Sequence, residues 1–135
     1  MVAVWVSDRL LLVRQSYRRG WTLPGGGVER GEDPRHAAQR ELNEETGIAT
    51  GREDLVPVFE TSGVWDFRQV FVQIFELQLH SQPSIRIDNR EIVAVRFERA
   101  SAAAALPLSL AVRRYLEACS RDSSAPVENW QCERR

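Results

Sequence analysis

Apolar residues in this chain occur in short runs separated by turn-forming residues, a pattern that predicts β-strands. The first two runs follow each other closely, with Ser7, Asp8 and Arg9 between them as a turn. Pro57 interrupts a later run, and because proline cannot donate a ladder hydrogen bond we expect that strand at a sheet edge or a bulge. The expected strands are Val2 to Val6, Arg9 to Val13, Leu55 to Glu60, Arg68 to His80 and Glu91 to Phe97.

Capping signals predict two α-helices. Asp33 is a good N-cap, Pro34 a good first helical residue and Gly47 a good C-terminal stop, so the first helix should run from Pro34 to Thr46. A second helix is expected at the end of the domain, and its arginines should be solvated. It spans Leu110 to Cys119 after a possible cap at Ser109, and those arginines are Arg113 and Arg114.

The segments between these elements predict loops and set the domain organisation. Ser62, Gly63 and Asp66 mark a loop, and the alanine-rich stretch 100–105 is expected to be a connector. Strands separated by helices, with hairpins between them, predict a mixed α/β (α+β) domain. We expect one domain over residues 1–120 and a polar tail over residues 121–135.

Composition narrows the function classes. The chain has 135 residues and a formal net charge of −1, which gives no reason to expect sequence-specific nucleic-acid binding. No apolar run approaches the ~18–20 residues that span a bilayer, so we expect no membrane partner and a cytoplasmic location. The only cysteines, Cys119 and Cys132, lack the spacing of a zinc site, and we expect free thiols without a catalytic role.

Three carboxylates crowd the C-terminal half of the first helix. At about 100° per residue, Glu41, Glu44 and Glu45 fall within about 100° of its surface. Acids there oppose the helix dipole and repel one another. Two interpretations remain open: a solvated acidic face, or a set of hard oxygen ligands for Mg²⁺, Mn²⁺ or Ca²⁺.

The loop that precedes this helix contains Gly25, Gly26 and Gly27 in the stretch LPGGGVERGE. It lacks the Gly-Lys-Ser/Thr of a phosphate-binding Walker loop and the pattern of a dinucleotide-binding loop. Glycines let the backbone lie close to a ligand. We therefore expect this loop to bring backbone groups near a metal–phosphate group.

The loop and helix together resemble the Nudix box. That signature is a glycine, five residues, a glutamate, seven residues, and then Arg-Glu-aliphatic-x-Glu-Glu-x-Gly-aliphatic. The similarity also extends, less sharply, over residues 2–118. The matching positions are Gly26, Glu32, Arg40, Glu41, Leu42, Glu44, Glu45, Gly47 and Ile48.

The resemblance implies a Nudix fold, a mixed β-sheet sandwiched between helices. It also implies hydrolysis, dependent on Mg²⁺ or Mn²⁺, of a diphosphate bond in a nucleoside diphosphate linked to another moiety. The alternative is a catalytically silent Nudix-fold module that binds or senses nucleotides. The substrate would be a nucleotide-type small molecule, and a homodimer is an open expectation.

The resemblance also implies roles for the residues of the box. Glu41, Glu44 and Glu45, with the Gly26 carbonyl, would hold the metal. Glu44 or Glu41 would be the general base. We expect Arg40 to be a catalytic residue as well. Glu32 is expected to pair with Arg40 and, like Gly47, to be structural within the motif. Outside the box, Glu91 is a candidate extra metal ligand or simply a surface acid.

Residues that bind the rest of the substrate are harder to assign. Arg19 and Trp21 precede the glycine loop and could reach a phosphate or a base, or the arginine could simply be exposed on the surface. Trp65 could stack on a nucleobase or anchor a loop. These three are the expected substrate-binding residues, and the identity of the substrate stays open.

Overall fold

A computed structural model describes residues 1–65 and 67–121 of the chain. The expected tail over residues 121–135 lies outside the described residues apart from Arg121, as do Cys132 and the loop residue Asp66. Within the described part, no helix is long and apolar enough to cross a membrane.

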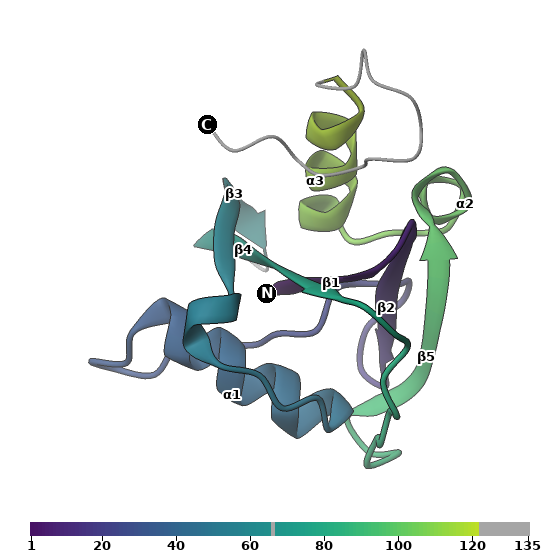
Figure 1. Cartoon of the computed structure of the whole chain (residues 1–135). Helices are drawn as coiled ribbons and strands as arrows, with labels where there is room; N and C mark the ends of the chain where they lie inside the picture. The colour runs from purple at the N-terminus through teal and green to yellow at the C-terminus, as the bar shows by residue number, and fades with distance from the viewer. Residues whose placement is uncertain (66, 122–135) are drawn as a thin grey trace.

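The fold is built on one mixed sheet of five strands in the order β3-β4-β1-β2-β5. β1 pairs parallel with β4, whereas the other neighbouring strands pair antiparallel. Figure 1 shows β1 inside the sheet, with β3 and β5 at its two edges. The strands are β1 (Val2–Val6), β2 (Arg9–Gln15), β3 (Val56–Trp65), β4 (Arg68–Leu79) and β5 (Ile92–Arg99).

Helices cover both faces of the sheet, as the alternation of apolar side chains in β1 requires. Ala3 and Trp5 belong to the core under the C-terminal helices, while Val2 and Val4 belong to the core under the first helix. Figure 1 shows the helices on opposite sides of the sheet. They are α1 (Pro34–Thr46) on one side, and α2 (Ala100–Ala104) and α3 (Leu110–Arg121) on the other; a short 3₁₀ turn, η1 (Arg52–Asp54), precedes β3. The expected α/β/α sandwich is confirmed.

The local signals that predicted α1 are confirmed. The Asp33 carboxylate accepts hydrogen bonds from the backbone N–H groups of Arg35 and His36, which satisfies two free donors of the first turn. Gly47 ends the helix in the left-handed conformation, with φ of 75°, and its N–H donates to the Asn43 carbonyl.

Two predictions about connections are wrong. β3 continues through Ser62 and Gly63 to Trp65, because its ladder with β4 runs on to the hairpin tip and outweighs the turn signal of a single glycine. The alanine-rich connector contains α2, which the high helix propensity of alanine favours. The interpretation of Pro57 is confirmed, since β3 is an edge strand and its register shifts between Pro57 and Phe59.

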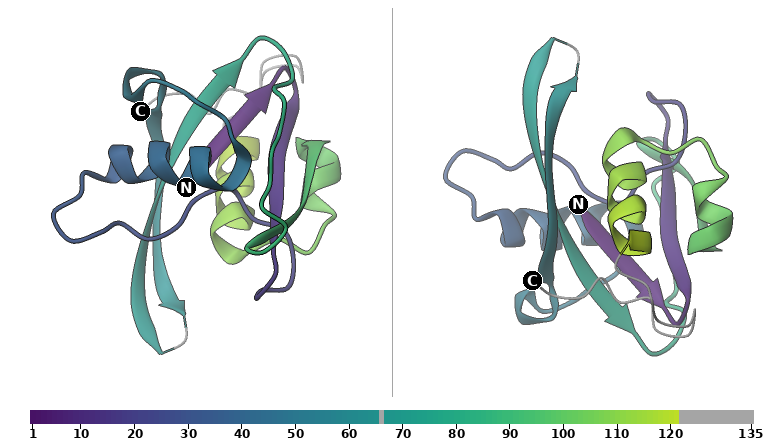
Figure 2. Two further views of the ribbon diagram at one scale, coloured as in Figure 1. Left: turned by 90° about the horizontal axis from the view of Figure 1, so that it is seen from below. Right: turned by 90° about the horizontal axis from the view of Figure 1, so that it is seen from above.

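The longer β3 also explains why Arg114, which we expected to be solvated, forms hydrogen bonds within the protein. Arg114 of α3 donates to the Thr61 hydroxyl and to the Ser62 carbonyl, both at 2.9 Å, and so fastens the helix to the edge strand. Arg113 is exposed, as expected, and Cys119 is buried and not in a disulfide bond. Figure 2 shows the hairpin of β3 and β4 projecting beyond the rest of the sheet.

Candidate active site

The glycine loop packs against the acidic side of α1. A Cβ atom added at Gly26 would lie 2.6 Å from Glu41 Oε1 and 2.7 Å from the carboxyl carbon, so any side chain there would displace that carboxylate. By contrast, a Cβ atom at Gly27 would meet no atom within 4 Å. The glycine at position 26 is therefore needed for close approach to Glu41.

Arg40 and Glu32 form the Arg–carboxylate pair that the resemblance implied. Arg40 Nε donates to Glu32 Oε1 at 2.9 Å and Nη2 donates to Oε2 at 3.0 Å, a two-point contact that fixes both groups. Nη2 also donates to the Gly27 carbonyl at 3.2 Å. The hydrogen bond from Arg40 lowers the pKa of Glu32 to about 2. Glu32 thereby ties the loop to the helix and stays ionised.

The same guanidinium also faces the other acids of α1. Arg40 Nη1 donates to Glu41 Oε1 at 3.0 Å and to Glu44 Oε2 at 3.3 Å. A positive charge from the chain itself thus offsets part of the repulsion among these carboxylates. The sequence pattern suggested that a bound cation offsets the repulsion among these acids. In the structure, Arg40 offsets part of it without a cation.

Glu45 is in a different environment. Its side chain is buried, and Oε2 accepts a hydrogen bond from the Gly25 N–H at 2.8 Å. Oε1 has no hydrogen-bond partner among the described residues. Burial is the main cause that raises the pKa of Glu45 to about 7, with Glu41 and Glu91 adding to it and the Gly25 hydrogen bond opposing it.

A buried carboxylate oxygen without a donor is costly and is the kind of atom that a hard cation would satisfy. The neighbouring donors are also hard oxygens, so the chemistry of this set suits Mg²⁺ or Mn²⁺. Within residues 1–65 and 67–121, however, no three His, Cys, Asp or Glu side chains are already grouped for a metal ion. Arg40 holds Glu41 and Glu44 instead, and a cation would compete with it for them.

Glu91, the candidate extra ligand, lies just before β5 and is exposed. Its Oε1 accepts a hydrogen bond from the Tyr17 hydroxyl at 3.3 Å. Its charge also raises the pKa of Glu45, which places it on the same side of the molecule as the carboxylates of α1. Its role stays a prediction.

A cavity of about 490 Å³ adjoins the glycine loop and is large enough for a small-molecule ligand. Arg19 and Trp21 both line it, as expected of substrate-binding residues. Trp21 has a second role, because it packs against the core and lies near the guanidinium groups of Arg14 and Arg96. Trp65 ends β3, and its side chain lies outside the described part of the structure.

Sequence reasoning missed Gln15 and Phe71, which also line the cavity. Phe71 lies in the expected strand Arg68 to His80, where a strand pattern accounts for a phenylalanine, and Gln15 lies two residues beyond the expected strand Arg9 to Val13, at the end of the observed β2. Gln15 and Phe71 line the same cavity only because the fold places β4 beside the glycine loop. No local signal in the sequence could have found them.

A model of the NUDIX domain matches residues 1–119. The chain belongs to the Nudix family. The match covers both α1 and the strands that carry the cavity, so the whole site lies within the Nudix domain.

Curated relatives match over a shorter segment. Nudix hydrolase 25 of Arabidopsis thaliana is 50% identical over 46 residues, and an RNA pyrophosphohydrolase of Rhizobium meliloti (strain 1021) is 48% identical over 48 residues. Each match covers 33% of this chain, and only 26% and 29% of the respective relative's own length. These similarities are therefore to a part of each relative.

Solved structures match over most of the chain. The MutT Nudix hydrolase from Burkholderia pseudomallei has a TM-score of 0.75 at 24% identity, covering 86% of this chain and 92% of its own. The dihydroneopterin triphosphate pyrophosphohydrolase of E. coli has a TM-score of 0.70 at 27% identity, covering 87% and 90%. The likeness confirms the Nudix fold.

Proposed function

We propose that this protein is a metal-dependent hydrolase that cleaves a diphosphate bond in a nucleoside diphosphate linked to another moiety. The observation that carries the proposal is the arrangement of α1 against the glycine loop. There Glu45 has a buried carboxylate oxygen that accepts no hydrogen bond from any described residue, and Glu41 lies against Gly26. Relatives named RNA pyrophosphohydrolase and dihydroneopterin triphosphate pyrophosphohydrolase support the same class of reaction.

Each residue has a role in this proposal. Glu41, Glu44, Glu45 and the Gly26 carbonyl hold Mg²⁺ or Mn²⁺, which neutralises charge on the diphosphate and makes bound water more acidic. Glu44 or Glu41 accepts the proton of the attacking water. Glu44 is exposed and reaches solvent, whereas Glu41 is half-buried against the loop.

The remaining charged residues of the box act through these groups. Arg40 is held by Glu32 in a fixed position and keeps Glu41 and Glu44 oriented in the free protein. Gly47 ends α1 two residues after Glu45, in the left-handed conformation. We propose a cytoplasmic location for the enzyme, and a homodimer stays a prediction.

The proposal is tested with a panel of nucleoside diphosphate derivatives and polyphosphates, assayed for product in Mg²⁺, in Mn²⁺ and in EDTA. We expect turnover of at least one compound with metal and none with EDTA. An inert wild-type protein across the panel would contradict the proposal. Tight binding of a nucleotide without turnover would instead support the silent module.

Two glycine variants provide a matched pair for the same assay. Gly26→Ala puts a methyl group onto the Glu41 carboxylate, so we expect kcat to fall by about a hundredfold, the order seen when active-site groups are displaced by about 1 Å. Gly27→Ala meets no neighbouring atom and should stay within a factor of about three of wild type. If the two variants were equally active, the Glu41 carboxylate would not take part in the reaction.

A further inference from the structure

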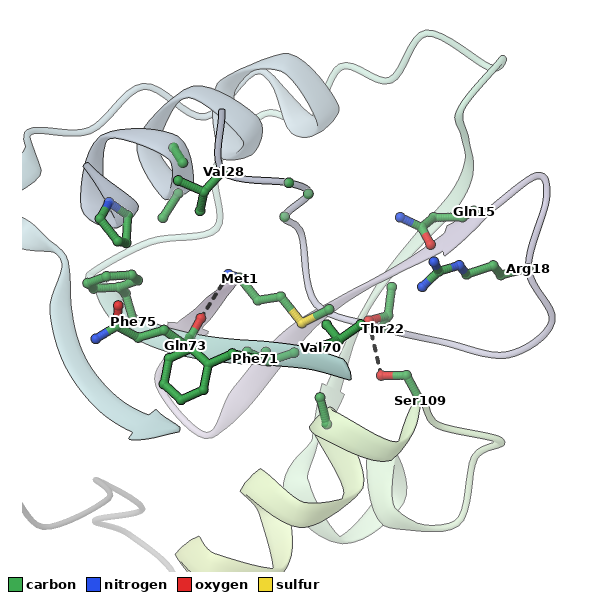
Figure 3. Close-up of a pocket in the computed structure, with 18 of the residues that line it drawn as sticks. Met1, Gln15, Arg18, Thr22, Val28, Val70, Phe71, Gln73, Phe75 and Ser109 are labelled. Atoms are coloured by element: carbon green, nitrogen blue, oxygen red, sulfur yellow. Dashed lines mark hydrogen bonds between the residues drawn. The ribbon is translucent and has the colours of Figure 1, made fainter. Parts of the chain in front are cut away.

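The hairpin of β3 and β4 has one strand edge that no other described strand covers. β3 pairs with the whole first half of β4, whereas β1 pairs with β4 only from Phe75 onward. Met1 extends this coverage slightly, because its amino group donates to the Gln73 carbonyl at 3.0 Å (Figure 3). Within the part of the chain that the structure describes, residues 68–72 therefore have a strand partner on one side only.

The uncovered edge presents backbone hydrogen-bonding groups. The Gln73 carbonyl and the Phe75 N–H both bond to Met1, and alternate residues of a strand direct their backbone groups to the same side. Gln69 and Phe71 therefore direct their N–H and C=O groups toward the uncovered edge. Across this edge, no described residue makes a hydrogen bond to these groups.

The opposite edge of the hairpin, formed by β3, is interrupted. Arg114 of α3 donates to the Ser62 carbonyl of β3, and Pro57 has no N–H to offer to another strand. Natural proteins interrupt exposed strand edges in such ways, since an open edge is a template for pairing with another chain. In the described structure, the β4 edge carries neither kind of interruption between residues 68 and 72.

Large apolar side chains surround the open edge. Phe67 is fully exposed just before β4, and Val64 and Phe71 are 68% and 64% exposed. Phe67 also has a φ of 62°, a conformation that is costly for a bulky residue and easier for asparagine or glycine. The hairpin projects beyond the rest of the sheet, so a partner can reach these side chains (Figure 2). An exposed apolar group of this kind marks an interaction surface.

The open edge suits a second copy of the same chain. Because Gln69 lies midway between Phe67 and Phe71, a two-fold axis at Gln69 places Phe67 of each copy opposite Phe71 of the other. Residues 69–73 carry no charge and the chain has a net charge of only −1, so two copies meet without strong repulsion. An axis further along β4 would bring the hairpin tip of the second copy against Met1, which already lies beside Gln73.

We propose that two copies of this chain associate through the β4 edges of their hairpins, in antiparallel pairing about a two-fold axis at Gln69. The two hairpins then form one continuous sheet, and Gln69 and Phe71 gain backbone partners. The assembly closes at two copies, because the interface is the same surface on both and the β3 edge is interrupted at Ser62. Phe71 also lines the cavity, so each copy lies along one wall of its partner's site.

The test measures self-association of the full chain by sedimentation equilibrium, from low micromolar to near-millimolar concentration. We expect a monomer–dimer equilibrium without larger species. The Gln69 and Phe71 amides should exchange their hydrogens more slowly as the dimer fraction rises. A protein that stays monomeric over this range would overturn the proposal. Slow exchange of these amides in the monomer would also overturn it, because another segment of the same chain would then cover the edge.

Charge variants at the axis locate the interface. Gln69→Lys and Gln69→Glu each place two like charges opposite each other, so we expect either variant alone to dimerise at least about tenfold more weakly. An equimolar mixture should restore a mixed dimer, because a lysine then faces a glutamate. Gln82→Lys adds the same charge at an exposed loop position and should leave dimerisation unchanged. A dimer that neither Gln69 variant weakens, or a mixture that restores nothing, would contradict the axis at Gln69.

A variant at the hairpin tip tests the apolar contact. Phe67→Asn removes the aromatic ring and adopts the positive φ more easily, so the monomer should keep or raise its melting temperature. Dimerisation should nevertheless weaken by about tenfold, because Phe71 of the second copy loses its partner. An unchanged dimer would exclude this contact. None of these measurements requires turnover, so they are independent of the proposed function.

Discussion

At the scale of single residues, the box glutamates have distinct surroundings although the sequence presents them as one acidic cluster. Arg40 contacts both Glu41 and Glu44. Within residues 1–65 and 67–121, one oxygen of Glu45 accepts a backbone N–H and the other has no hydrogen-bond partner. The sequence predicted their common side of the helix. It could not predict which of them is buried, because that depends on the path of the loop around Gly25.

The environment of Glu45 predicts a pH dependence of stability without metal. Its folded pKa of about 7 lies above the usual 4.5, so between these values the folded state keeps a proton that the unfolded state loses. Glu45 therefore destabilises the fold increasingly as pH rises from about 4.5 to about 7. Glu45→Gln still accepts the Gly25 N–H but cannot ionise, so it should gain on the order of 2 kcal/mol over wild type at pH 8 and little at pH 4.5.

The measurement is urea unfolding of both proteins in EDTA at pH 4.5, 6 and 8. Glu45 also raises the pKa of the nearby Met1 amino group, so the difference between the two proteins reports Glu45 together with its coupling to that group. A constant difference across these pH values would contradict a raised pKa.

At the scale of elements, α1 has strong signals at both ends and a conflict in its last turn. Asp33 and Gly47 made its boundaries predictable, because caps are local interactions. β3 and α2 were mispredicted for other reasons. Cross-strand pairing of β3 with β4 overrides the signal of a single glycine, and the high helix propensity of alanine produces α2 where we expected a connector.

The conflict in α1 predicts that a divalent cation stabilises the protein. Ligands that bind only the folded state raise its stability, so millimolar Mg²⁺ or Mn²⁺ should raise Tm by several degrees. The cation should slow backbone hydrogen exchange most in the last turn of α1. Glu45→Gln should reduce both this protection and the rise in Tm. A melting temperature that neither cation changes would count against a metal at this site.

At the scale of the whole molecule, the mixed sheet brings distant parts of the chain to one cavity. β2 contributes Gln15, the glycine loop lies beside α1, and β4 contributes Phe71. The sequence predicted the fold class and the chemistry of the box, because the box is contiguous and its spacing is specific. It did not predict the cavity, because the lining combines segments near the glycine loop with residues of β4 that lie more than thirty positions further along the chain.

The central claim is that water attacks a phosphorus atom of a diphosphate with the help of the carboxylates of α1. The most direct test is a single-turnover reaction in H₂¹⁸O with the best compound of the panel and Mg²⁺, followed by mass spectrometry of the products. The account predicts one ¹⁸O atom in a phosphate product of the wild-type protein, and no labelled product in the same time from Glu44→Gln combined with Glu45→Gln. Unlabelled products, or equal labelling by the double variant, would contradict it.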